Sequence, residues 1–173
     1  MKKYYFCLTM SIKLSKKKPD IQLEQAVEAD EVYIVAGHKG QPGNVIKAGR
    51  RPRNRRLKGQ PGRGTSASEK PSVLDLVQRS GELVLRVLDN VKQTTIRPII
   101  EKHVKDGTLI YTDEYNIYNR LTKWGFSHKT VCHSKGEYAR DDDGDGFFEV
   151  HVNTQEGIWS VLRSWLRPHR GMP

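Results

Sequence analysis

The chain has 173 residues, a length that suits one domain with a substantial hydrophobic core. Its net charge of +10 favours a polyanionic partner such as nucleic acid over a small neutral ligand. Two cysteines are too few for a disulfide framework or a zinc ribbon and indicate a reducing cytosol, and no apolar stretch is long enough to span a membrane.

Two basic segments lack the periodicity of packed elements. Residues 1–25 are polar and rich in lysine, and we interpret them as a basic N-terminal arm or the remnant of something longer. Residues 37–71 are rich in glycine and contain no acidic residue before Glu69, so we expect a flexible cationic insertion that cannot build a core. The basic residues that we single out in this insertion are Lys47, Arg50, Arg51, Arg53, Arg55, Arg56, Lys58 and Arg63.

Periodic segments lie before and after the insertion. Val27 to Val35 is rich in β-branched residues and predicts a strand, with Asp30, Val32 and Ile34 on one face. The next predicted elements are strands at Ser72–Val77 and Glu82–Leu88, a helix from Thr94 or Thr95 to about Lys105, a strand at Thr108–Asp113, a helix at Glu114–Trp124, a strand at Ser127–His133 and a last helix from Asn153. This β-β-β-α-β-α-β-α order predicts an α/β domain over residues 26–173.

The stretch ARDDDGDGFFE at residues 139–149 imitates a metal-binding loop. It carries four aspartates and two glycines, and its first half has the alternate oxygen ligands and the glycine of a calcium-binding EF-hand loop. Val152 stands at the twelfth position, where that loop needs a bidentate glutamate, and no helix-forming run precedes Asp141. We therefore predict a solvated acidic turn and expect metal ligands to lie elsewhere.

Asp30 and Asp113 are candidate site residues because of where they stand in their strands. Asp30 interrupts an apolar strand, where a buried carboxylate is costly unless it is hydrogen-bonded, paired or coordinated. Asp113 ends another strand, and the carboxyl ends of strands are where α/β sheets expose functional groups. If the two strands are neighbours, the two carboxylates face each other. The alternative for Asp113 is a cap of the helix that follows.

The last predicted helix supplies a third carboxylate, Glu156, which shares a helix face with Arg163 seven residues later. The alternative is structural, because Asn153 followed three residues later by glutamate matches a capping box. Three carboxylates from two strands and a helix suit two Mg²⁺ or Mn²⁺ ions about 4 Å apart, which can activate a nucleophile and stabilise the leaving oxygen of a phosphodiester. This is the arrangement of ribonuclease H-like phosphoryl-transfer enzymes, and the five predicted strands fit their mixed five-stranded sheet flanked by helices.

Three segments carry a family resemblance. These segments are VEADEVYI, LIYTDEYNIYNRL and HVNTQEGIWSVLRSWLRPHRG. In order and in spacing they resemble the catalytic domain of bacterial DDE transposases of the ISXO-like insertion sequences, a group related to the Merlin transposons. The similarity runs from about residue 28 to residue 171. In this family the D-E-x-Y motif supplies the first metal ligand and the T-D-x-Y motif the second, which implies these roles for Asp30 and Asp113.

The family's third motif is H-x-N-x-x-E-x-x-W followed by a basic residue. The resemblance implies that this motif supplies the third metal ligand, for which Glu156 is our first choice and Asn153 the second. Arg163 is the matching basic residue and would position a phosphate. The basic insertion would approach the DNA backbone, unless it is only a solvated loop.

The resemblance implies a DNA transposase that uses Mg²⁺ or Mn²⁺ to cleave phosphodiesters and to transfer the strands of an insertion sequence. Its partners would be transposon-end DNA, target DNA and further copies of itself, in the cytoplasm at the nucleoid. Family members usually carry a zinc ribbon and a helix-turn-helix before this domain, whereas about 27 residues precede the first strand here, so we expect a truncated transposase. The alternatives are an inactive remnant that only binds DNA or a full-length relative, and a nuclease that cuts without joining strands.

Overall fold

The computed structural model describes residues 21–34, 71–79 and 81–166 of the chain. The predicted arm up to residue 20 and the predicted insertion up to residue 70 lie outside the described residues. Residues 21–25, which we assigned to the arm, are part of the packed domain. Leu23 is fully buried there and forms a parallel bridge with Val104.

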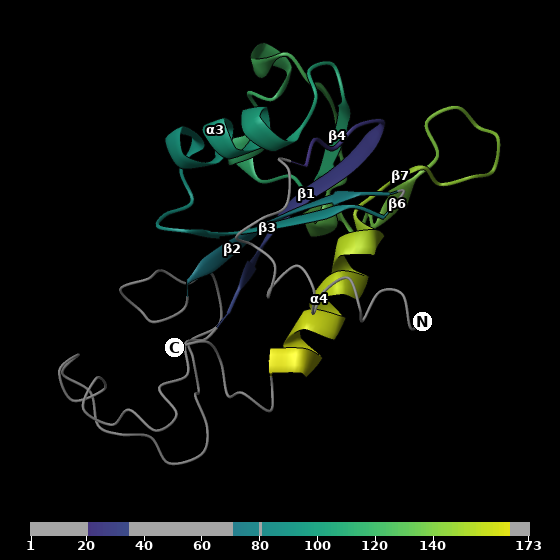
Figure 1. The fold of residues 1–173 in the computed structure, drawn as a ribbon. Helices are drawn as coiled ribbons and strands as arrows, with labels where there is room; N and C mark the ends of the chain where they lie inside the picture. Colours follow the sequence, from purple (N-terminus) through teal and green to yellow (C-terminus); the bar gives the residue numbers. More distant parts are fainter. Residues whose placement is uncertain (1–20, 35–70, 80, 167–173) are drawn as a thin grey trace, which may run out of the picture.

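One mixed five-stranded sheet forms the centre of the domain (Figure 1). Its strands are β1 (Ala26–Tyr33), β2 (Ser72–Gln78), β3 (Leu83–Leu88), β4 (Leu109–Thr112) and β5 (Ser127–Thr130). In space the order is β3-β2-β1-β4-β5, with β2 antiparallel to both of its neighbours and β1, β4 and β5 parallel. Three antiparallel strands followed by two parallel ones form the sheet of the ribonuclease H-like fold, so the predicted fold class is confirmed.

A helix packs on one face of the sheet. α3 (Gln93–His103) buries Ile96 and Ile100, which join the core cluster that contains Val27 and Ala29 of β1. The basic side chains of its last turn suit the negative end of the helix dipole. Because successive residues of a strand point to opposite faces, Glu28, which lies between Val27 and Ala29, belongs to the other side of the sheet, as does Asp30.

The second helix, α4 (Asn153–Leu166), covers that other side (Figure 1). Its residues Leu162 and Leu166 pack with Val32 and Ile34, which follow Asp30 on the same face of the chain. The predicted start of this helix and the predicted face of the strand are therefore confirmed. In the described ranges, neither α3 nor α4 combines the length and the apolar character needed to cross a membrane.

The predicted helix at Glu114–Trp124 is wrong. The structure has two single 3₁₀ turns in its place, at Asn116–Tyr118 and Thr122–Trp124. The reason is local, because the Asp113 carboxylate accepts the N–H of Tyr115 at 2.9 Å and this side-chain bond replaces the start of a helical ladder. Gly125, with φ at 96°, ends the segment as predicted.

The fifth strand is shorter than the predicted Ser127–His133. It ends at Thr130, because Glu114 accepts the backbone N–H groups of His133 at 2.9 Å and Ser134 at 3.0 Å and bends the chain into a 3₁₀ turn. A carboxylate from a neighbouring loop thus takes donors that would otherwise have continued the strand.

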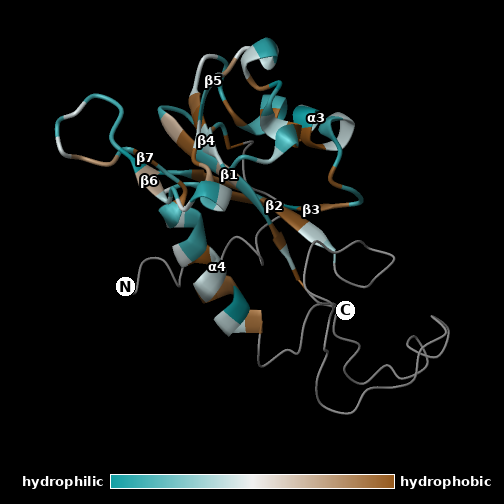
Figure 2. Ribbon diagram, turned by 180° about the vertical axis from the view of Figure 1, so that it is seen from behind, coloured by the Kyte–Doolittle hydropathy of each residue, from teal (hydrophilic) through white to brown (hydrophobic). Residues whose placement is uncertain are grey.

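A small sheet that the sequence did not predict stands at the base of the acidic stretch. β6 (Ala139–Arg140) and β7 (Val150–His151) pair as two antiparallel strands. The residues between them form a loop that protrudes from the domain and is mostly hydrophilic (Figure 2). We call residues 141–149 the acidic loop.

Candidate active site

Asp30 and Asp113 lie close to each other on adjacent parallel strands, with Asp30 inside β1 and Asp113 directly after the last residue of β4. In the pairing of β1 with β4, Glu28 lies opposite Tyr111, so Asp30 and Asp113 each follow the last paired residue of their strand by two positions. The charge of Asp113 acts on Asp30 and raises its pKa. The two strands are neighbours, which was the condition for the two carboxylates to face each other.

The surroundings of Asp30 disfavour its charge. Burial, followed by the charge of Asp113, raises the pKa of Asp30 to about 8. Smaller contributions come from the charges of Glu31 and Asp75, while the N–H that Glu31 donates to Oδ1 at 2.6 Å works in the opposite direction. In the described part of the chain no cationic side chain offsets these carboxylates at Asp30. The pair would therefore be stabilised by a cation.

Asp113 also has a structural contact, since its Oδ1 accepts the N–H of Tyr115 at 2.9 Å. This is the capping role that we considered as the alternative, although the cap closes a turn rather than a helix. The contact holds the carboxylate at the end of β4, beside Asp30. Capping and a place in the site are therefore compatible.

Glu156 and Asn153 are both exposed at the start of α4. The capping box that was the alternative for Glu156 does not form, because the Asn153 N–H is donated to Nδ1 of His151 at 3.3 Å. The Glu156 side chain makes no hydrogen bond or ion pair with another described residue. Its carboxylate is therefore available to a ligand, but no contact in the described ranges joins it to Asp30 or Asp113.

The sheet-facing side of α4 is anchored on both sides of Glu156. Gln155 donates Nε2 to the backbone oxygen of Asp75 at 3.1 Å, and Trp159 donates its indole N–H to the Asp75 carboxylate at 3.0 Å. Viewed down the helix axis, the Glu156 position lies about 100° from that of Gln155 and about 60° from that of Trp159. Glu156 therefore stands at the edge of the helix face that packs on the sheet. Arg163 is exposed two turns later, and its guanidinium lies 5.8 Å from the centre of the Trp159 ring.

Sequence reasoning missed Asp75, which is fully buried and lies directly across from Asp30 in the pairing of β1 with β2. Burial raises the pKa of Asp75 to about 7, against the lowering effect of the Trp159 N–H. Its Oδ1 has no hydrogen-bond partner among the described residues. A signal was present, because SVLDLV sets an aspartate inside an apolar strand just as VEADEVYI does.

Glu28 and Arg79 were missed as well. Glu28 is fully buried, and its Oε1 accepts Nε of Arg79 at 2.9 Å. The two residues are 51 positions apart in the sequence, and no local pattern links them. Only the pairing of β1 with β2 brings them together.

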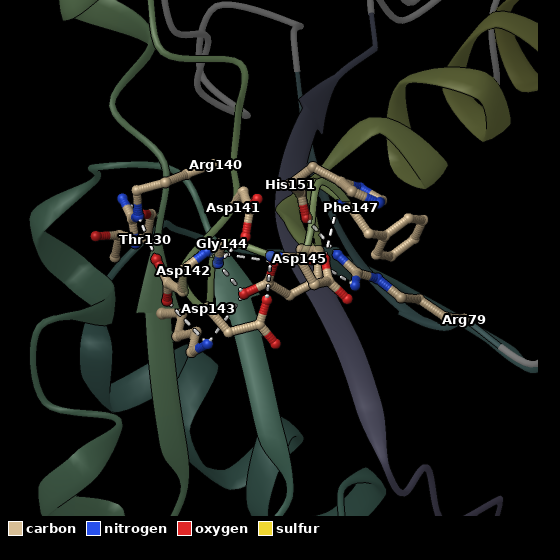
Figure 3. Close-up of polar contacts among 12 residues, drawn as sticks. Arg79, Thr130, Arg140, Asp141, Asp142, Asp143, Gly144, Asp145, Phe147 and His151 are labelled. Atoms are coloured by element: carbon tan, nitrogen blue, oxygen red, sulfur yellow. Dashed lines mark hydrogen bonds and ion pairs between the residues drawn. The ribbon is translucent and has the colours of Figure 1, made fainter.

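The acidic loop is organised by its own hydrogen bonds (Figure 3). Asp141 accepts the N–H groups of Gly146 at 2.8 Å and Gly144 at 2.6 Å, and these bonds lower its pKa. Asp142 pairs with Lys129 at 2.8 Å and with Arg140 at 2.6 Å. Turn-forming aspartates and neighbouring cations therefore account for this loop, and the predicted acidic turn is confirmed.

Three carboxylates of this loop gather closely. Oxygens of Asp141, Asp143 and Glu149 lie within 4.8 Å of one another. Asp143 accepts the N–H of Asp145 at 3.2 Å, and Glu149 accepts that of Asp142 at 3.2 Å. The loop thus brings together, through backbone hydrogen bonds, three carboxylates that are close enough to share a cation.

Comparison with known proteins identifies the family. Residues 22–172 match the family model described as ISXO2-like transposase domain. An uncharacterized protein in transposable element ISH50 of Halobacterium salinarum is 34% identical over 156 residues, which make up 89% of this chain and 49% of that protein. An uncharacterized transposase-like protein of Haemophilus influenzae is 29% identical over 87 residues, which make up 50% of this chain and 64% of that protein.

The matched region spans about half the length of the halobacterial protein and less than two thirds of the Haemophilus protein. Among solved structures, a chain of the simian T-cell lymphotropic virus intasome in complex with PP2A regulatory subunit B56 gamma aligns with a TM-score of 0.42 at 11% identity, covering 91% of this chain and 46% of that chain. The match to the family model covers nearly the whole sequence and includes all three segments that carried the resemblance. The chain belongs to the ISXO2-like transposase family.

Proposed function

We propose that this chain carries the catalytic domain of an insertion-sequence DNA transposase, which cleaves phosphodiesters and transfers strands in a reaction that depends on divalent cations. The observation that carries the proposal is the pair of Asp30, inside β1, and Asp113, directly after the adjacent parallel strand β4, in a member of a transposase family. We assign this activity to residues 26–173. The partners would be transposon-end and target DNA and further copies of the chain, in the cytoplasm at the nucleoid.

The donor set fits Mg²⁺ or Mn²⁺. Both ions prefer carboxylate oxygens, and the pKa of Asp30 is raised by burial and then by the neighbouring charge of Asp113, without a counter-charge among the described residues. Asp30 and Asp113 would hold the ions. The third ligand would be Glu156, with Asn153 as the second choice. When bound, two such ions activate the attacking oxygen and stabilise the leaving oxygen of an in-line displacement.

The chain's own groups would bind and orient the DNA around this pair. Asp30 has to give up its proton to become a ligand, so cation binding and proton release are coupled. Arg163 is exposed on α4 and would hold a phosphate through its planar guanidinium. The eight basic residues from Lys47 to Arg63 lie outside the described residues, and we propose that they hold the DNA backbone.

The test is nicking of supercoiled plasmid with Mg²⁺, Mn²⁺ or EDTA. Asp113→Asn removes the charge but keeps an oxygen for the Tyr115 N–H, so the turn after β4 is retained. We expect metal-dependent nicking that this variant lowers by at least about a hundredfold. Asp89→Asn, which alters an exposed carboxylate, is the matched control and should nick like the natural chain.

Two other outcomes separate the remaining readings. DNA binding without metal-dependent nicking in any variant would mean an inactive DNA-binding protein. Nicking without joining of a labelled transposon-end oligonucleotide to the plasmid would mean a nuclease.

A further inference from the structure

We propose that Glu28 and Arg79 are positioning residues for this reaction. They fasten the first turn of α4 to the sheet and thereby set Glu156 relative to Asp30 and Asp113. The inference rests on the proposed function, because it assigns a purpose to the place of Glu156.

Glu28 reaches the start of the helix from β1. It is fully buried, two residues before Asp30, and its Oε1 accepts the hydroxyl of Thr154 at 2.8 Å. Its Oε2 accepts the backbone N–H of Gln155 at 3.3 Å. These are the two residues directly before Glu156. A carboxylate at this place satisfies a free N–H of the first turn and suits the positive end of the helix dipole.

Arg79 holds Glu28 and the chain that leads into α4 at the same time. Its Nε donates to Glu28, its Nη1 to the backbone oxygen of Glu149 at 2.7 Å and its Nη2 to that of His151 at 2.8 Å. Figure 3 shows the guanidinium reaching toward this backbone. The guanidinium also lies 4.0 Å from the centre of the Tyr111 ring. A planar group with fixed donors ties together β1, β4, β7 and the end of β2.

His151 is not a competing partner of Glu28. Its Nδ1 lies 3.4 Å from Oε1 of Glu28, but the same nitrogen accepts the N–H of Asn153 at 3.3 Å and therefore carries no proton. Burial, followed by the charge of Arg79, lowers the pKa of His151 and keeps the ring neutral. The charge that balances Glu28 is that of Arg79.

The position of Glu156 depends on this anchorage, because its own side chain has no contact with the described residues that would fix it. It is exposed, and its side chain makes no hydrogen bond or ion pair with another described residue. Its place is set by the helical turn that carries it, and that turn is fixed to the sheet through Thr154 and Gln155. Residues that orient a metal ligand contribute about 10- to 100-fold to metal affinity or activity. We expect an effect in this range when the anchorage is removed.

The experiment compares Glu28→Gln and Thr154→Val with the natural chain. Glu28→Gln keeps the shape but removes the charge that pairs with Arg79, and Thr154→Val removes one donor with little risk to folding. Ile100→Val, in the core cluster on the opposite face, is the control for a general loss of stability. The first readout is hydrogen exchange of the metal-free proteins, and the second is Mn²⁺ affinity measured by electron paramagnetic resonance without DNA.

We expect faster exchange confined to the first turn of α4 in both variants, and Mn²⁺ affinity lowered by about tenfold in Glu28→Gln and less in Thr154→Val. In a Glu156→Gln background, Glu28→Gln should cause no further loss of affinity, because the effect acts through Glu156. Ile100→Val should leave Mn²⁺ affinity unchanged and should not single out the first turn of α4 in hydrogen exchange.

Unchanged exchange in the first turn of α4 would overturn the inference, whatever happens to activity. Local loosening with unchanged Mn²⁺ affinity would overturn it too, provided that Glu156→Gln alone weakens binding. The proposed function fails if the natural chain binds no Mn²⁺ and the Asp113→Asn variant nicks DNA as efficiently as the natural chain. The positioning role, which rests on that function, then fails too.

Discussion

Without divalent cations, the domain is expected to lose stability as the pH rises from about 5 to about 7, and Asp30→Asn should reduce this loss. An unfolded aspartate titrates near 3.8, whereas burial and the charge of Asp113 raise the pKa of folded Asp30 to about 8. Between these values the folded domain keeps a proton that the unfolded chain has released. The free energy of unfolding therefore falls by about 1.4 kcal/mol per pH unit through this group, or about 3 kcal/mol between about pH 5 and about pH 7.

Asp75 acts in the same direction up to its own pKa of about 7, which burial raises. Its share remains in the Asp30→Asn variant, so the variant keeps a shallower pH dependence rather than none. The contribution of each group is fully present below the unfolded pKa, falls steadily between the unfolded and the folded pKa, and is gone once the pH has risen through the folded pKa. A saturating concentration of Mn²⁺ should remove most of the loss, because it binds the deprotonated pair.

The assay is urea unfolding followed by tryptophan fluorescence in EDTA at about pH 5, 6 and 7. The difference in slope between the natural chain and Asp30→Asn should be about 1.4 kcal/mol per pH unit. Asp106→Asn, an exposed carboxylate, serves as the control and should follow the natural chain. Equal slopes in all three proteins would refute the reasoning, since they would mean that Asp30 is charged in the folded domain at neutral pH.

Three further substitutions test the packing around the site by urea unfolding. Leu162→Ala, at the buried interface of α4, should cost about 2 to 4 kcal/mol, and a loss below about 1 kcal/mol would mean that α4 is loosely packed. Tyr118→Phe removes the hydroxyl that donates to buried Glu31 at 2.5 Å and should cost about 1 to 3 kcal/mol. No change in the free energy of unfolding would mean that solvent replaces this hydrogen bond. Gly125→Ala should cost about 1 kcal/mol because φ is 96° there, and a neutral result would contradict the left-handed turn.

The sheet was predictable because each strand has a local pattern of apolar and β-branched residues. β1 alternates residues that belong to two cores, with Val27 and Ala29 on one side and Val32 and Ile34 on the other, and the sequence shows this pattern directly. The segment after β4 was not predictable in this way. Its conformation depends on the hydrogen bond that the Asp113 carboxylate accepts from the Tyr115 N–H, and a pattern of apolar residues does not reveal such a bond.

The site residues also fall into those that a local pattern reveals and those that only the folded structure reveals. Asp30 and Asp113 could be singled out from their places in strands and from family motifs. The anchorage of α4 could not, because Glu28 and Arg79 meet only after β1 and β2 have paired. Asp75 is an intermediate case, since the aspartate in SVLDLV was visible and its meaning depends on the residue across the pair.

The face of the sheet beneath α4 is divided into an apolar part and an acidic part. Val32 and Ile34 pack against the last two turns of the helix, as expected of a face built for stability. Glu28, Asp30 and Asp75 occupy the neighbouring positions, where burial of each carboxylate costs free energy that apolar residues would not. These costly groups are confined to the part of the face beside Asp113 and beneath the first turns of α4. A divalent cation bound there would neutralise the charges that destabilise the domain, so the predicted loss of stability at neutral pH and the proposed metal-dependent chemistry have the same physical origin.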